Sequence, residues 1–97
     1  MTADSVPIRL DDRVFVVSRA RWVELDGETV VYDPEREEVH LLDSVATSVW
    51  SLLGEEESLS VVCDELAAAF GAPLDQVRSD VLMLVSKLHD SGLIELR

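Results

Sequence analysis

The chain has 97 residues, of which 47% are hydrophobic and 29% are charged, and this composition is typical of one globular domain. Twenty Asp and Glu residues against eight Lys and Arg residues give a net charge of −12, which repels phosphate backbones and anionic lipid. We therefore expect neither nucleic acid nor membrane as a partner. Since the sequence has neither a membrane-spanning run nor a signal peptide, we expect a cytoplasmic protein.

The N-terminal half of the chain reads as an arm followed by strands. Residues 1–12 are polar and interrupted by proline, which predicts a flexible arm before a single domain over residues 13–97. The apolar run at residues 14–17 favours a short strand or a segment laid over a sheet. Strands are then predicted at residues 21–25, 28–32 and 37–42, because Asp26-Gly27 is a strong hairpin signal and Asp33-Pro34 favours a type I turn.

The lengths of the two turns predict which strand residues lie opposite one another. A two-residue loop pairs Val23 with Val30, and a four-residue loop pairs Val30 with Val39. One face of the sheet then collects apolar side chains and is expected to form the core: Val23, Leu25, Val30, Tyr32, Val39 and Leu41. The opposite face carries Trp22 and Val31, for which residues 14–17 are the nearest cover.

Three helices are predicted in the C-terminal half, at residues 45–53, at residues 59–70, and from Pro73 to Ser91-Gly92. Trp50 is expected in the core. The last helix carries one apolar stripe, which consists of Leu74, Val77, Val81, Leu84, Val85 and Leu88. Along the edge of that stripe lie Arg78, Leu82 and His89. The predicted fold class is α+β, a three-stranded antiparallel meander followed by three helices.

The residue types that carry out catalysis or bind metal ions are scarce. The chain has two histidines and one cysteine, Cys63, with no metal-binding spacing between them. Its four glycines form no phosphate-binding pattern, and no nucleophile is paired with a base in the sequence. We therefore expect no enzyme activity, no metal and no cofactor.

A family resemblance lies in the third predicted strand and the helix after it. The sequence there reads Glu37-Glu38-Val39-His40-Leu41-Leu42-Asp43, then Ala46-Thr47, then Val49-Trp50-Ser51-Leu52-Leu53. This run, together with the segments Leu59 to Leu66 and Val77 to Leu93 and the closing pattern L-x-x-x-G-L-I, resembles the PqqD family of RiPP recognition elements over about residues 20–97. The resemblance implies a winged helix-turn-helix-like peptide chaperone that binds the leader of a ribosomally made precursor peptide. It would present that leader to a modifying enzyme, such as a leader peptidase, a radical-SAM enzyme or a cyclase.

The same resemblance implies a site between the third strand and the third helix, where the leader adds as a further strand. An edge strand offers unpaired backbone groups for such pairing, and neighbouring apolar pockets select side chains. The expected peptide-binding residues are Glu38, Val39, His40, Leu41, Leu42, Arg78, Leu82, Val85 and His89. Arg78 would bond a leader carboxylate. Val39, Leu41 and Val85 have core packing as their alternative role.

Two other functions remain open alternatives. A winged-helix DNA-binding regulator would use the third helix, but that helix carries Arg78 and Lys87 against Asp75, Asp80 and Asp90 and cannot neutralise phosphates. A docking module that binds only its partner enzyme would use the acidic surface instead. The pathway also stays open between a lasso peptide, pyrroloquinoline quinone maturation and a kinase-associated peptide system.

Overall fold

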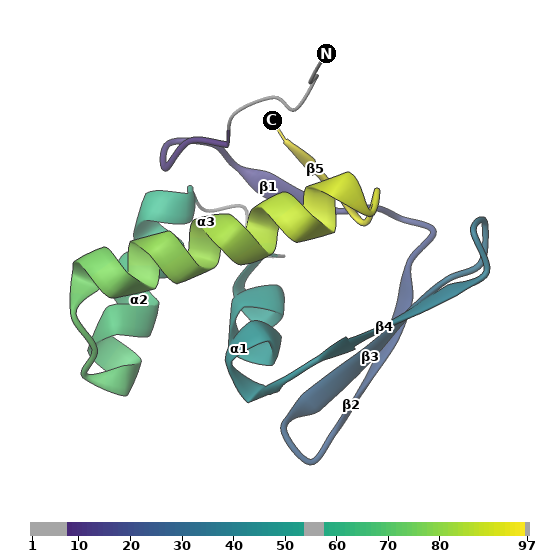
Figure 1. Cartoon of the computed structure of the whole chain (residues 1–97), viewed down its shortest axis with the longest axis horizontal. Coiled ribbons are helices and arrows are strands. Elements are labelled where there is room, and N and C mark those ends of the chain that lie inside the picture. Colours follow the sequence, from purple (N-terminus) through teal and green to yellow (C-terminus); the bar gives the residue numbers. More distant parts are fainter. Residues whose placement is uncertain (1–7, 54–57, 97) are drawn as a thin grey trace.

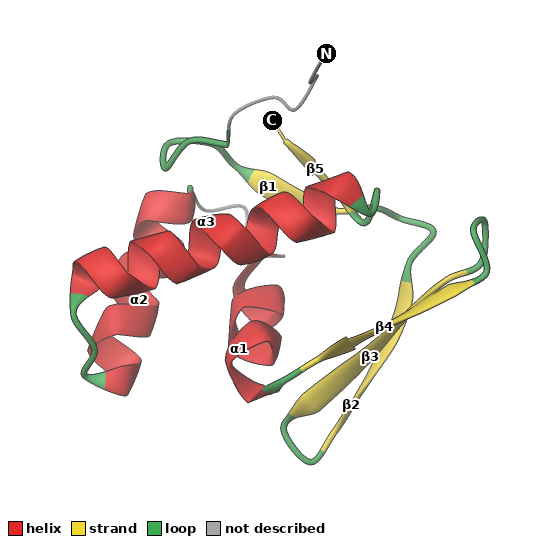
Figure 2. Cartoon of the chain, in the orientation of Figure 1, coloured by secondary structure: helices red, strands yellow, loops and turns green. Residues whose placement is uncertain are grey.

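The computed structural model describes residues 8–53 and 58–96. Its elements follow the order β1 (Val14–Val16), β2 (Arg21–Leu25), β3 (Glu28–Asp33), β4 (Glu38–Leu42), α1 (Ser44–Leu53), α2 (Leu59–Phe70), α3 (Leu74–Asp90) and β5 (Ile94–Leu96). Figures 1 and 2 show β2, β3 and β4 as one meander that lies beside three packed helices. This α+β arrangement confirms the predicted fold class.

The first hairpin of the meander forms as predicted. Asp26 has a φ of 53° and Gly27 a φ of 80°, which is the two-residue turn geometry that Asp-Gly favours. Val23 lies opposite Val30, as the loop length requires. The Asp-Gly signal therefore fixes both the turn and the register of β2 against β3.

The second hairpin has a register different from the predicted one. Val30 lies opposite Leu41 and not opposite Val39, a shift of two residues. The cause is that Asp33 remains in β3, and the turn that follows ends at Glu37, whose φ is 56°. The Asp33 carboxylate stabilises this turn, because its Oδ1 accepts the amide of Glu35 at 3.0 Å. A shift of two keeps each side chain on its predicted face.

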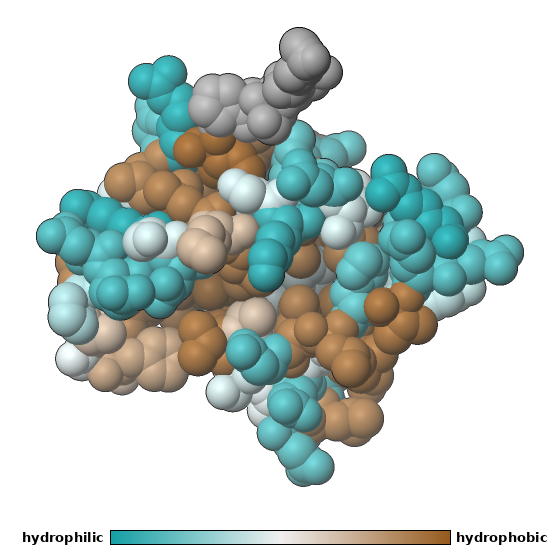
Figure 3. Space-filling model, viewed as in Figure 1, coloured by the Kyte–Doolittle hydropathy of each residue, from teal (hydrophilic) through white to brown (hydrophobic). Residues whose placement is uncertain are grey.

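The face that was predicted to form the core is the exposed one, and this prediction was wrong. Its exposed side chains are Val23 (51% exposed), Leu25 (60%), Tyr32 (40%), Val39 (60%) and Leu41 (77%), with Val30 half-buried among them. We call these six residues the outer face. In Figure 3, hydrophobic surface gathers over the meander at the lower right.

The opposite, inner face of the meander packs against α1. Val31 and Leu42 are buried there, and the Thr29 hydroxyl donates to the Thr47 hydroxyl of α1 at 2.9 Å. Polar residues are tolerated on a buried face when they find such partners. The rings of Trp22 and Trp50 meet edge to face with their centroids 5.3 Å apart. Helix α1, rather than residues 14–17, therefore packs on the inner face, and Trp22 stays 52% exposed there.

Helices α2 and α3 begin and end where predicted, whereas α1 begins at Ser44, one residue before its predicted start, and the residue after its predicted end lies outside the described residues. Ser58 caps α2 by accepting the amide of Val61, and Gly71 ends that helix with a φ of 60°. Pro73 precedes α3. Trp50 is buried as expected, together with Val77, Val81, Val85 and Leu88 of the α3 stripe. Among the described residues, no helix combines the length and the apolar character needed to cross a membrane.

The two ends of the described chain meet on the helical side of the molecule. β1 pairs antiparallel with β5, and Val14 lies opposite Leu96. Residues 8–12 belong to the predicted flexible arm, yet the carbonyl of Asp12 accepts the amide of Leu59 at 2.9 Å and that of Leu10 accepts the amide of Ser60 at 2.7 Å. These bonds tie residues 8–12 to the start of α2. The rest of the predicted arm, residues 1–7, lies outside the described residues.

Candidate functional site

The edge of β4 is the feature that positions the candidate site. In the strand order β2-β3-β4, β4 lies at the end of its sheet, so in the part of the chain that the structure describes it pairs with β3 alone. The C-terminal half of α3 faces this edge across a groove with a volume of about 690 Å³. Backbone groups along such an edge can accept one more strand.

The walls of the groove combine apolar and charged side chains. The strand wall consists of Val39, His40, Leu41 and Leu42. The helix wall consists mainly of Leu84, Lys87 and Leu88. These helix positions recur at i, i+3 and i+4, so they lie on one face of α3. A strand edge, apolar helix residues and one lysine together suit an extended peptide better than a compact small molecule.

Each end of the groove is fixed by a hydrogen bond. At one end Asp43 caps α1, and its Oδ1 accepts the amide of Ala46 at 2.8 Å. At the other end the Arg36 Nη1 donates to the carbonyl of Ser91 at 2.9 Å, directly after α3. The second bond joins the turn between β3 and β4 to the end of the helix, and therefore holds the two walls together.

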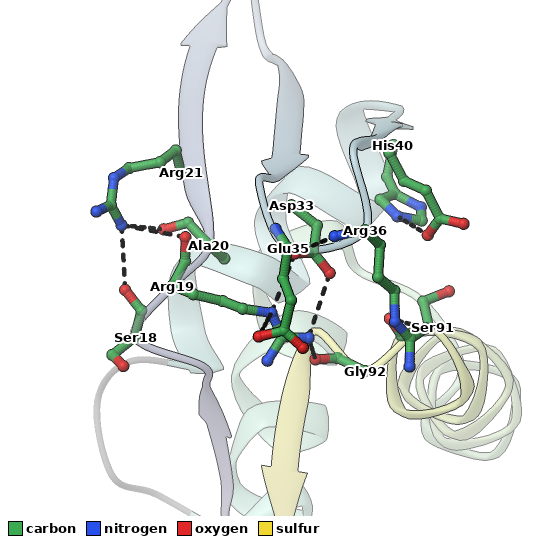
Figure 4. A network of polar contacts seen from close by, with 11 residues as sticks. Ser18, Arg19, Ala20, Arg21, Asp33, Glu35, Arg36, His40, Ser91 and Gly92 are labelled. Carbon is green, nitrogen blue, oxygen red and sulfur yellow. Dashed lines mark hydrogen bonds and ion pairs between the residues drawn. The ribbon is translucent and has the colours of Figure 1, made fainter.

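A second arginine strengthens the same connection, as Figure 4 shows. Arg19 donates to both carboxylate oxygens of Asp33, from Nε at 3.0 Å and from Nη2 at 3.2 Å, and Nη2 also donates to the carbonyl of Gly92 at 2.8 Å. These hydrogen bonds hold the pKa of Asp33 below its ordinary value and raise the pKa of Arg19. Because the guanidinium bridges β3 and the residues after α3, it sets the position of the meander relative to the helix.

The structure brings together the strand residues of the predicted site but not the helix residues. Val39, His40, Leu41 and Leu42 line the groove. Glu38 lies at the start of β4, with its Oε1 3.5 Å from Nε2 of His40. Whether these residues contact a peptide stays a prediction.

The four helix residues of the predicted site lie outside the groove lining. Val85 is fully buried in the core, and Leu82 packs against that core. Arg78 lies 4.0 Å from Asp75 on its own helix, and His89 is half-buried. Leu84, Lys87 and Leu88 take their place along the groove. The apolar stripe predicted which residues share a face, but it did not show which edge of the stripe turns towards β4.

The remaining chemistry of the described residues is limited. Within residues 8–53 and 58–96 there is no cluster of three or more His, Cys, Asp or Glu residues that could hold a metal ion. Burial raises the pKa of the Cys63 thiol, which keeps it in the weakly nucleophilic protonated form. The feature that the arrangement offers is the binding groove beside β4.

Comparison with known proteins finds relatives that are named PqqA binding protein. The chain is 31% identical to the PqqA binding protein of Rhizobium meliloti over 99% of this chain and 98% of that protein. It is 35% identical to the PqqA binding protein of Bradyrhizobium diazoefficiens over 67% of this chain, and it spans 61% of that relative's length. The chain is also 34% identical to the PqqA binding protein of Xanthomonas axonopodis pv. citri, over 81% of this chain and 76% of that protein.

A solved structure and a family model complete the comparison. The structure of TbiB1 in complex with the TbiA(beta) leader peptide superposes with a TM-score of 0.79, covers 84% of this chain and 94% of its own, and shares 22% sequence identity. At that identity the likeness establishes the fold. The model of the family described as coenzyme PQQ synthesis protein D matches residues 28–94, the span from β3 to the start of β5. The chain therefore belongs to the PqqD family.

Proposed function

We propose that this protein binds the leader segment of a ribosomally synthesised precursor peptide as an additional strand along β4, and presents it to a modifying enzyme. The observation that carries the proposal is the edge of β4, which among the described residues pairs with β3 alone, beside a groove whose other wall is α3. The names of the relatives support a peptide ligand, because they refer to binding of PqqA. The protein would supply recognition, and its partner, a leader peptidase, radical-SAM enzyme or cyclase, would supply the chemistry.

A strand added at this edge would divide its side chains between two environments. Successive residues of a strand point to opposite faces of the sheet. One set would enter the groove towards Leu84 and Leu88, and the other would lie beside Val39 and Leu41 on the outer face. Lys87 lines the groove together with Asp43 and Asp90, so a leader carboxylate is expected beside Lys87 and away from the two aspartates. Backbone bonds would give affinity, and the groove would give selectivity.

Titration of synthetic PqqA into the isotope-labelled protein tests this proposal. We expect saturable 1:1 binding in calorimetry and slower hydrogen exchange at alternate amides of β4, because a guest strand bonds every second residue of an edge. The amides of β2, the other edge strand of the meander, are the internal control and should keep their exchange rates. Proline placed at alternate positions of the peptide segment should abolish binding, since proline cannot donate to the ladder.

Three results would contradict the proposal in different ways. A module that docks only on its partner enzyme would show no saturable binding of PqqA. A DNA-binding regulator would shift a duplex in a gel at low salt, although the acidic charge of the chain opposes this. Protection at β2 instead of β4 would keep peptide binding but place it on the wrong edge.

A further inference from the structure

A second hollow continues the groove past the end of β4, and it lies among the three helices. It has a volume of about 240 Å³ and shares Asp43, Ala46 and Leu84 with the groove. The residues that line this hollow but not the groove belong to the start of α1, the end of α2 and the first half of α3. A peptide strand that follows β4 to Asp43 therefore reaches this hollow without leaving the surface.

The hollow has a buried apolar floor and an exposed apolar rim. Val49, Val77 and Val81 form the floor and are at most 9% exposed. Val45 and Phe70 stand at the rim and are 53% and 55% exposed. Cavities of about 150 Å³ with aliphatic walls accept a benzene ring. The hollow is thus large enough for one aromatic or branched aliphatic side chain.

The charges at the hollow all have one sign. Asp43 and Asp80 are its charged lining residues, and both are exposed. Each accepts one hydrogen bond, Asp43 from the amide of Ala46 at 2.8 Å and Asp80 from the Gln76 Nε2 at 3.0 Å. These bonds hold the two carboxylates in place, and within residues 8–53 and 58–96 neither forms an ion pair with a lysine or arginine side chain. A neighbouring cation on the ligand would complement them.

We propose that this hollow is a second subsite of the peptide groove, which takes a large apolar side chain that stands next to a lysine or arginine in the precursor peptide. This assignment rests on the proposed function, because the occupant is the segment of the same peptide that continues beyond the added strand. Continuity with the groove and the two carboxylates distinguish this occupant from a second copy of the chain. Another copy, with its own net charge of −12, would bring further negative charge to the rim.

Small probes test the chemistry of the hollow independently of any peptide. Phenethylamine and phenylacetate carry the same ring, with an ammonium in the first and a carboxylate in the second. In NMR titrations of the full chain we expect phenethylamine to shift signals of Val45, Phe70 and Val81 saturably, and phenylacetate to bind at least fivefold more weakly. Equal binding of both probes, or shifts confined to the outer face of the meander, would overturn the proposal.

Variants connect the hollow to the peptide. Phe70→Ser removes part of the rim and should weaken phenethylamine at least fivefold and PqqA at least threefold, while the β4 amides stay protected in the complex. Met83→Ser is the matched control, because Met83 is 62% exposed on α3 and does not line the hollow. Asp80→Asn keeps an acceptor for Gln76 and should reduce the preference for the cationic probe, because Asp43 remains at the hollow.

The outcomes for the two proposals are separable. If PqqA protects β4 but binds Phe70→Ser and the unsubstituted protein equally well, the subsite is refuted and the strand-addition proposal stands. If PqqA gives no protection of β4, the strand-addition proposal fails first, and the hollow loses the occupant assigned to it.

Discussion

Two adjacent leucines of β4 offer a direct test of which face of the meander is buried. Leu41 is 77% exposed on the outer face, and Leu42 is 7% exposed against α1. Replacement of each by alanine removes the same atoms from the same strand. The intrinsic effect of alanine on strand formation is therefore nearly equal in the two variants, and the difference between them reports burial.

The expected magnitudes follow from these exposures. Loss of a buried leucine costs about 2–5 kcal/mol, and we expect Leu42→Ala near the lower end because β4 is an edge strand. Full burial of a leucine is worth about 1.5–3 kcal/mol, so Leu41, about a quarter buried, contributes roughly 0.5 kcal/mol. A domain of this length has a free energy of unfolding of about 5–15 kcal/mol. Leu42→Ala thus removes a large share of it.

Urea unfolding followed by tryptophan fluorescence measures both variants. With a urea slope of about 1–3 kcal/mol/M, Leu42→Ala should lower the unfolding midpoint by about 1 M or more and Leu41→Ala by a few tenths. Circular dichroism at the same urea concentrations checks that both probes report one transition. If Leu41→Ala is as costly as Leu42→Ala, or costlier, the assignment of the two faces is refuted.

Further predictions concern the arginine contact, the groove and the cysteine. Arg19 holds the pKa of Asp33 below that of an unfolded aspartate, which is about 4. The pair therefore stabilises the fold fully above about pH 4, and this stabilisation is lost as the pH falls through the lower pKa of the folded state. Asp33→Asn should therefore flatten the acid limb of a plot of unfolding free energy against pH, and an unchanged limb would contradict the role of the pair. Leu84→Asp should weaken the proposed binding of PqqA, measured by calorimetry, at least tenfold, and Leu82→Asp should weaken it much less. Both leucines are half-buried, but of the two Leu84 lines the groove. The reverse order of effects would favour the other edge of α3 as the groove wall. Cys63 is fully buried with a raised thiol pKa, so Ellman's reagent should label it at the rate of unfolding, and immediate labelling in buffer would disprove its burial.

The elements that the sequence predicts correctly are those fixed by local chemistry. The two-residue turn at Asp26-Gly27 has a positive φ at both of its residues. Ser58 and Gly71 satisfy the backbone groups at the two ends of α2. These signals need no knowledge of distant residues. The bounds of the helices and the first hairpin were therefore accessible from the sequence.

The errors concern contacts between distant segments. Alternation along β3 and β4 separates two faces, but the choice of the buried face depends on where α1 packs. Thr29 and Asp33 look like surface residues in the sequence, yet Thr47 and Arg19 satisfy them in the interior. The apolar stripe of α3 likewise lacks a marker for the edge that turns towards β4. Only the three-dimensional structure selects Leu84 over Leu82.

Because the outer face of the meander is exposed, the acidic composition of the chain controls whether its copies associate. Six apolar side chains on one layer would draw copies of the chain together at neutral pH if nothing opposed them. The net charge of −12 makes the copies repel one another, and this repulsion disappears as the solution approaches the isoelectric point near 4.3. Mild acid should consequently turn a dispersed protein into a self-associating one before the fold is lost, with light scattering that rises while the circular dichroism spectrum is unchanged.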